Sequence, residues 1–151
     1  DRPIADLLER SVYLNNINAA KKGSRIELAE EQDDAVLRID ADKIRQVVDN
    51  LLSNAIKFSP PNSTIQVLRE RDTAHYSVLV RDQGPGIPEN ERHKLFKDFG
   101  QTSVKPTGGE KSTGLGLAIC KRIMESHGGS IAAESVPAGG SVFRITFPLA
   151  A

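Results

Sequence analysis

Paired runs in which apolar and polar residues alternate constrain the fold of this chain more than any other feature. The runs 64–71 and 75–81 flank a turn near Asp72, and the runs 130–135 and 141–147 close the chain. Alternate residues of a strand lie on the same face, so each pair predicts a hairpin with one buried face. Helical segments separate the hairpins, which favours an α+β fold: a two-layer sandwich with one mixed, largely antiparallel sheet and helices on one face.

Apolar residues at helical spacing predict three long helices. The first spans about 4–22, the second spans 43–58, and the third begins near Leu115. Ser59-Pro60-Pro61 ends the second helix, because proline cannot continue a helix, and His127-Gly128-Gly129 ends the third as a glycine cap would.

Two short strand-like runs, 25–29 and 35–39, precede the second helix. An acidic turn separates them, so we predict a further hairpin there. Asp40 or Asp42 is placed to cap the helix that follows.

Composition restricts the function classes. A chain of 151 residues fits one domain, 1–151, and its 20 Lys+Arg balance its 20 Asp+Glu. Because the chain has no net positive charge, we do not expect nucleic acid or anionic membranes as partners. We find no membrane-length apolar run and no signal peptide, and the single cysteine fits a reducing compartment, so we expect a cytoplasmic domain. Because the chain begins with Asp1, we expect it to be part of a longer protein.

The segment before the third helix is rich in turn residues. A short helix is expected at about 89–99, and 100–112 then carries three glycines and a proline without any apolar period. A loop of this length inside a domain is usually functional, and we interpret 100–112 as a lid.

A polar stripe borders the buried face of the second helix. On a helical wheel Asn54 and Lys57 lie within about 40° of Asn50, and the two asparagines are one turn apart. Amide oxygens can ligate Mg²⁺, which usually shares its ligand shell with nucleotide phosphates, and a lysine can hold a phosphate. A solvated helix face with fortuitous amides is an equal alternative on spacing alone.

Asp82 continues the apolar face of the run 75–81. A carboxylate there is costly unless it is hydrogen-bonded, and an adenine amino group is one partner that would satisfy it. Gly84 and Gly86 would let the backbone approach a planar base. A tight turn that begins with an aspartate is the structural alternative.

Residues 112–117, Ser-Thr-Gly-Leu-Gly-Leu, lead into the third helix, where free backbone N–H groups can hold phosphates. The segment is not a dinucleotide fingerprint, because Ile119 stands at the last glycine position. It is not a P-loop either, because Glu110 stands where a glycine should precede the lysine.

Taken in order, these segments resemble the catalytic and ATP-binding domain of sensor histidine kinases. Residues 50–59 are similar to the asparagine box, 82–88 to the first glycine box, 95–99 to the phenylalanine box and 113–119 to the second glycine box. The resemblance covers nearly the whole chain. It implies the Bergerat ATP-binding fold shared with gyrase, heat-shock chaperone and MutL-type ATPases, with ATP and Mg²⁺ as cofactors.

The resemblance also implies a role for individual residues. Asn54 would be the principal Mg²⁺ ligand, with Asn50 as a second ligand or phosphate contact, and Asn50 and Lys57 would serve catalysis. Asp82 would accept from the adenine amino group, and Ser141 would reach the base through water. The remaining nucleotide contacts implied are Phe58, Gly84, Gly86, Ile87, Thr113, Gly114, Leu115, Gly116 and Leu117. Phe96 and Phe99 would anchor the front of the lid.

The implied reaction is transfer of the γ-phosphate to a histidine. Related ATPases carry a glutamate base where this chain has Asn50, and an amide cannot take a proton at neutral pH. The acceptor would lie on an upstream dimerisation domain that is absent from this sequence, and the phosphoryl group would pass to a response-regulator aspartate. The full-length protein would be a homodimer. The alternatives are a serine kinase of the anti-sigma type and an ATP-binding regulatory module without transfer.

Several residues depart from the pattern or are expected to be structural. Many relatives have a cation just after the phenylalanine box, where this chain has Gln101, and Lys105 or Lys111 could substitute from the loop. We expect the three histidines, His75, His93 and His127, to be structural or exposed. Cys120 is predicted to pack as a small hydrophobe.

Overall fold

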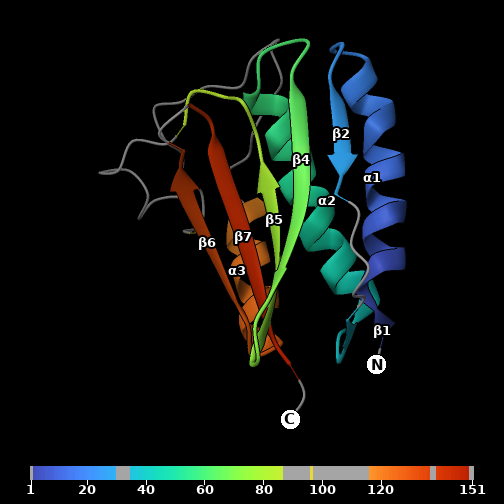
Figure 1. Cartoon of the computed structure of the whole chain (residues 1–151), viewed down its shortest axis with the longest axis vertical. Coiled ribbons are helices and arrows are strands. Elements are labelled where there is room, and N and C mark those ends of the chain that lie inside the picture. Colours follow the sequence, from blue (N-terminus) through green and yellow to red (C-terminus); the bar gives the residue numbers. More distant parts are fainter. Residues whose placement is uncertain (1, 30–34, 87–95, 97–115, 137–138, 150–151) are drawn as a thin grey trace.

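The residues that the structure describes fold into a five-stranded sheet and three long helices, with a separate two-stranded ribbon. The computed structural model describes residues 2–29, 35–86, 96, 116–136 and 139–149 (Figure 1). The helices are α1 (Ile4–Ala20), α2 (Ala41–Phe58) and α3 (Gly116–Ser126). The strands are β1 (Arg2–Pro3), β2 (Arg25–Leu28), β3 (Val36–Leu37), β4 (Thr64–Arg71), β5 (His75–Arg81), β6 (Ser130–Ser135) and β7 (Ser141–Pro148). The short helix expected at 89–99, except Phe96, and the lid at 100–112 lie outside the described residues.

The sheet has the order β2-β4-β5-β7-β6. The pairs β4–β5, β5–β7 and β6–β7 are antiparallel, which confirms the two predicted hairpins. Only β2 runs parallel to its neighbour β4, with Arg25 opposite Thr64. The sheet is therefore mixed and largely antiparallel, as the sequence predicts.

The hairpin predicted from 25–29 and 35–39 is wrong. β2 pairs with β4, whereas β3 pairs with β1 in a separate two-stranded ribbon. Alternation of apolar residues identifies the buried face of a strand, but it does not name the partner strand. Parallel strands need a long connection, and here the connection from β2 to β4 contains α2.

The helices form a layer on one face of the sheet. In Figure 1, α2 and α3 lie behind β4, β5 and β7, and α1 lies beside β2. Tyr76 and Phe147 project from the sheet into this interface and are 1% exposed. Leu51 and Leu52 of α2 and Met124 of α3 are equally buried. The core thus lies between the layers and fixes α2 against the strand ends.

The ends of α2 are held by polar contacts. Asp40 is the N-cap, because its carboxylate accepts from the backbone N–H of Lys43 at 3.3 Å. At the other end, Lys22 Nζ donates to the carbonyl oxygens of Ile56 (2.7 Å) and Lys57 (3.2 Å). A cation there satisfies terminal carbonyls and offsets the negative end of the helix dipole.

His127 links the end of α3 to the start of α2. Its Nε2 accepts from the backbone N–H of Asp40 at 3.0 Å, and its Nδ1 lies 2.8 Å from the carbonyl oxygen of Ile123. This contact agrees with the structural role expected for the residue. In the part of the chain that the structure describes, no helix combines the length and apolarity needed to span a bilayer.

Candidate functional site

Asp82 and Ser141 form the polar centre of one end of the sheet. Asp82 follows β5, Ser141 begins β7, and both side chains are buried, at 4% and 5% exposed. Asp82 Oδ2 accepts from Ser141 Oγ at 2.8 Å, while Oδ1 accepts from the backbone N–H groups of Gly84 (2.9 Å) and Ser141 (3.2 Å). Burial raises the pKa of the Asp82 carboxyl, and these hydrogen bonds oppose that rise.

Glycines let three backbone segments meet around Asp82. A Cβ on Gly84 would lie 2.6 Å from the carbonyl oxygen of Phe58, and one on Gly140 would lie 2.1 Å from the carbonyl oxygen of Asp82. Gly140 also has φ +94°, which disfavours any side chain. The end of α2, the turn after β5 and the turn before β7 are consequently packed backbone to backbone.

The polar stripe of α2 lies at the border of the buried face of that helix, as the sequence predicts. Asn50, Asn54 and Lys57 are half-buried, between a fully buried row and exposed residues such as Gln46. α3 begins against this stripe, since a Cβ on Gly116 would lie 3.1 Å from Asn50 Oδ1. The structure therefore brings the asparagine box and the last part of the second glycine box into contact.

Some predicted site residues are not described. The described part of the chain contains Asn50, Asn54, Lys57, Phe58, Asp82, Gly84, Gly86, Gly116, Leu117 and Ser141. Ile87, Thr113, Gly114, Leu115, Phe99 and Gln101 lie outside it. Phe96 is described and packs against the core, whereas the lid that it is expected to anchor lies outside the described residues.

Two residues of the site were missed by sequence reasoning. The sequence pattern does not single out Gly140, although its close approach to Asp82 requires the absence of a side chain. Cys120 is buried as predicted, and its thiol also lies 3.9 Å from the carbonyl oxygen of Val47 on α2. The spacing of four between Gly116 and Cys120 was the available signal, because it places both on one face of α3.

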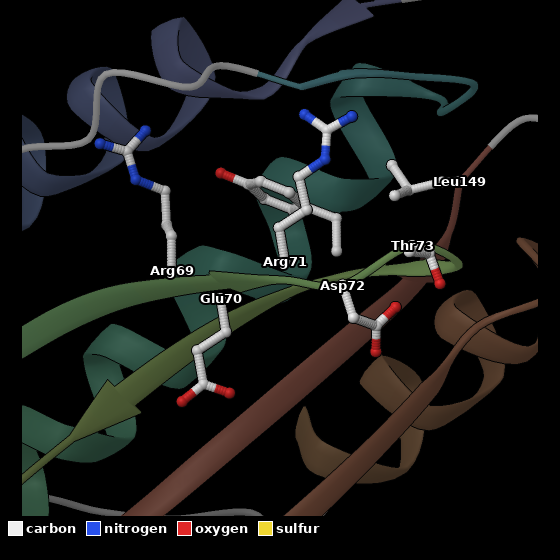
Figure 2. A pocket seen from close by; sticks show the side chains of 7 residues that line it. Arg69, Glu70, Arg71, Asp72, Thr73 and Leu149 are labelled. Carbon is white, nitrogen blue, oxygen red and sulfur yellow. The ribbon is translucent and has the colours of Figure 1, made fainter.

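A cavity of about 650 Å³ lies elsewhere, around the turn between β4 and β5. Figure 2 shows Arg69 and Arg71 on one side of β4, and Glu70 and Asp72 on the other. Arg69 Nη2 donates to the carbonyl oxygen of Ala29 at 3.0 Å, and Glu70 pairs with Arg144 at 2.8 Å. None of the predicted site residues lines this cavity, so it is separate from the site around Asp82 and Asn50.

Over residues 39–151 the chain matches the family described as histidine kinase-, DNA gyrase B- and HSP90-like ATPases. The match extends over well more than half of the sequence, and the chain belongs to this family. Its relatives refine the assignment: the domain is of the kind that forms the catalytic ATPase part of sensor histidine kinases.

Among those relatives is the sensor histidine kinase TmoS of Ectopseudomonas mendocina, 37% identical over 148 residues, which are 96% of this chain and 15% of that protein. Another is the circadian input-output histidine kinase CikA of Synechococcus elongatus, 45% identical over 117 residues, which are 75% of this chain and 15% of that protein. The chain thus spans a small part of the curated relatives it matches.

Solved structures agree on the fold. A mycobacterial sensor histidine kinase, MprB, matches with a TM-score of 0.85 and 27% identity over 97% of this chain and 95% of that one. The nucleotide-free catalytic domain of histidine kinase ThkA matches with a TM-score of 0.79 and 31% identity over 96% of this chain and 93% of that one. The predicted fold and family are therefore confirmed.

Proposed function

We propose that this domain binds Mg²⁺-ATP and donates the γ-phosphate to a histidine on a dimerisation domain of the same protein. The observation that carries the proposal is that the candidate site has two chemically different ends. A buried carboxylate, Asp82, lies beside backbone without side chains, and an amide stripe on α2 meets the start of α3. The first end suits a purine base and the second suits a metal and phosphates.

The Asp82 end has the capacity to select adenine. Each oxygen of a carboxylate can accept two hydrogen bonds, and Asp82 Oδ2 accepts one, from Ser141 Oγ. The second lone pair of Oδ2 can accept a hydrogen bond from an adenine amino group. The carbonyl oxygen of guanine would instead be repelled by the carboxylate. Ser141 is held by Asp82, and its hydroxyl would share a water with the base.

The α2 end fits Mg²⁺ by the chemistry of its donors. Within the described residues no group of three or more His, Cys, Asp and Glu side chains could hold a metal. Asn50 and Asn54 instead offer neutral amide oxygens one turn apart, which suit a hard cation that keeps waters and shares phosphate oxygens. Bound there, Mg²⁺ would neutralise phosphate charge, and Lys57 would add a cationic contact one turn further.

The same residues favour transfer to a histidine side chain over hydrolysis. Asn50 cannot abstract a proton from water, so the domain holds and polarises the γ-phosphate until an external nucleophile is aligned. The backbone N–H groups of Gly116 and Leu117 at the start of α3, with those of Thr113, Gly114 and Leu115, would orient the phosphates. Phe58, Gly84, Gly86 and Ile87 would border the base.

Partners are proposed from the relatives. A further structural neighbour is histidine kinase ThkA in complex with the response regulator TrrA, with a TM-score of 0.77 and 30% identity over 97% of this chain and 40% of that one. We propose that the phosphoryl group passes to a response-regulator aspartate in the same way, within a cytoplasmic homodimer. The proposed function does not involve nucleic acid.

Calorimetric titration tests nucleotide binding directly. The chain would be titrated with ADP and a non-hydrolysable ATP analogue, with Mg²⁺ or with chelator, as parent, Asn54→Ala and Asp82→Asn. We expect Asn54→Ala to lose the affinity gained from Mg²⁺ and Asp82→Asn to lose binding in both conditions. Gln46→Ala, an exposed amide two turns before Asn54 on the same stripe, is the matched control and should bind like the parent. Absence of binding in the parent would overturn the proposal.

Phosphotransfer needs its own assay. The chain would be mixed with a histidine-bearing dimerisation domain and radiolabelled ATP, and acid-labile phosphate would be measured. Transfer to histidine supports the kinase role, whereas acid-stable phosphate on a serine would favour the anti-sigma type. Binding without any transfer would reduce the domain to a regulatory module.

A further inference from the structure

The outer face of α1 carries most of the exposed large apolar side chains. Three of the four such side chains in the described residues lie there: Tyr13 is 72% exposed, Leu14 44% and Ile17 58%. They fall within little more than one helical turn. The other face of the helix is buried, and α1 packs on α2 and β2. Figure 1 shows α1 at the outer edge of the molecule, beyond β2. The exposed side chains therefore form one apolar patch on a helix that already has a core-facing side.

Polar contacts fix the rotation of α1 about its own axis. Asn16 Oδ1 accepts from the backbone N–H of Ile26 at 2.7 Å, and Asn16 Nδ2 donates to the carbonyl oxygen of Ile26 at 3.1 Å. Asn15 Nδ2 donates to the carboxylate of Asp49 on α2 at 3.0 Å. These bonds tie α1 to β2 and to α2, so the helix cannot turn the apolar patch inward without breaking them. The patch is a fixed feature of the surface.

Charged residues extend the patch in both directions along α1. On a helical wheel, one arc of about 100° holds a row of exposed residues, which we call the outer stripe: Asp6, Arg10, Tyr13, Leu14, Ile17 and Lys21. Lys21 belongs to the row because this C-cap residue keeps helical backbone angles. Neighbouring positions along the stripe are mostly three or four residues apart, as in the seam between two packed helices. The stripe has apolar side chains in its middle, a carboxylate at its start and an ammonium group at its end.

The order of the charges makes the outer stripe complementary to itself. In an antiparallel pair of α1 helices that places Tyr13 of one copy opposite Leu14 of the other, Asp6 lies opposite Lys21. Two-fold symmetry forms this ion pair twice. A parallel pair would instead bring like charges together at both ends of the stripe. The outer stripe therefore fits a second copy of this chain in the antiparallel orientation.

We propose that the outer stripe of α1 is a self-association surface, on which a second copy of this chain docks antiparallel. Interfaces that bury less than about 1,200 Å² are weak, and a single helix stripe predicts weak association between separate chains. Within a longer homodimeric protein the two copies would be linked, and short linkers give effective concentrations of the order of mM. The contact would then hold two catalytic domains side by side, a consequence that rests on the proposed function.

Sedimentation equilibrium of the chain measures this association directly. Loading concentrations from about 10 µM to about 1 mM reach the range that linkage would supply. The mean mass of the parent should rise from that of one copy toward that of two. Ile17→Glu places a charge in the middle of the outer stripe and should stay monomeric throughout. Ala132→Glu is the matched control, because it adds the same charge at an exposed position of β6, at the opposite edge of the sheet from β2, and it should associate like the parent.

Charge reversal tests the orientation of the two helices. Asp6→Lys and Lys21→Asp each replace two ion pairs with two like-charge contacts, and each should raise the Kd of self-association about three- to tenfold. The double variant Asp6→Lys/Lys21→Asp restores both ion pairs with exchanged signs and should recover the parent Kd. Both positions are exposed, and circular dichroism checks that each variant is folded.

A parent chain that remains monomeric up to about 1 mM would overturn the proposal. So would an Ile17→Glu variant that associates like the parent, because another surface would then be responsible. A double charge variant no better than either single variant would overturn the antiparallel pairing. None of these measurements uses nucleotide, so a chain that fails to bind Mg²⁺-ATP can still self-associate. A monomeric chain that binds Mg²⁺-ATP would contradict the self-association alone.

Discussion

Ser141 binds Asp82 twice, through its hydroxyl at 2.8 Å to Oδ2 and through its backbone N–H at 3.2 Å to Oδ1. The backbone N–H of Asp82 in turn donates to the Ser141 carbonyl oxygen at 2.9 Å. The carboxylate is therefore fixed by a residue from β7, 59 positions away in sequence. In the proposed function, the orientation of the Asp82 carboxylate toward a base would depend on the pairing of β5 with β7.

Ser141→Ala should weaken both folding and adenine binding. It removes a hydrogen bond to a buried charged group, which is worth about 1.5–3 kcal/mol of unfolding free energy. The Asp82 carboxylate also loses a restraint on its rotation, so the ADP Kd should rise. Urea denaturation and calorimetry measure the two effects. Ser141→Thr keeps the hydroxyl and should recover both, while Ser130→Ala, an exposed serine on β6, should change neither; equal effects of Ser130→Ala and Ser141→Ala would contradict the account.

The stability of the chain should carry a pH dependence that Asp82→Asn removes. Burial raises the folded-state pKa of Asp82 above its ordinary value of 3.8. Between 3.8 and that raised pKa, the folded chain binds more protons at this site than the unfolded chain. The contribution of Asp82 to the unfolding free energy therefore falls as pH rises through this window and is constant above it.

Asp82→Asn does not titrate and can keep the three local hydrogen bonds, since its Nδ2 can donate to Ser141 Oγ. The parent's stability relative to the variant should thus decline as pH rises from 3.8 through this window. Chemical denaturation at a series of pH values measures the difference. A difference that increases over the same range would show that the carboxylate is stabilised by the fold, contrary to its burial.

Two neighbouring glycines offer a matched test of the close backbone approach at the site. Gly139 and Gly140 both have positive φ, at +101° and +94°, but a Cβ on Gly139 meets nothing within 4 Å. Gly139→Ala should cost only the backbone strain of about 1–2 kcal/mol. Gly140→Ala adds a clash with the Asp82 backbone, so it should be clearly less stable and should bind ADP more weakly. Thermal unfolding and calorimetry compare them, and indistinguishable variants would argue against this packing.

Lys22→Met should destabilise the end of α2 that carries Lys57. Lys22 Nζ satisfies two terminal carbonyls of that helix, and methionine keeps the apolar stem without the charge. Loss of these charge-assisted hydrogen bonds should cost about 1.5–3 kcal/mol of unfolding free energy. Lys21→Met, at the exposed neighbouring lysine, is the control. Urea denaturation that gives the same value for both variants would contradict the contact.

The sequence was most informative where one segment decides its own structure. The limits of α2 follow from Asp40 and from Ser59-Pro60-Pro61, and the β4–β5 hairpin follows from two alternating runs around Asp72. Each of these signals is local. Asn50, Asn54 and Asp82 could likewise be selected, because a polar side chain beside a buried face is conspicuous within its own element.

Contacts between distant elements were not predictable in the same way. The periodicity of α3 places Cys120 on the buried face, but nothing in that pattern identifies the Val47 carbonyl oxygen as the group that its thiol meets. The prediction for β2 failed for the same reason: the short separation between the runs 25–29 and 35–39 permits a hairpin, and only the assembled sheet shows that β2 pairs with β4. Gly140 needed the register of β7 before its contact with Asp82 could be recognised.

The parallel pairing of β2 with β4 also bears on the order in which the chain folds. Arg71 and Tyr76 pair in the β4–β5 hairpin, which requires closure of a loop of only a few residues. Pairing of Arg25 with Thr64 requires closure of a much longer loop that contains α2. The entropic cost of closing a loop increases with its length, so the first 28 residues join a nucleus that the later strands can form among themselves. Amide hydrogens of β2 should accordingly exchange through smaller opening reactions than those of β5. The proposed nucleotide site should therefore stay folded longer than the N-terminal edge of the sheet when the domain begins to unfold.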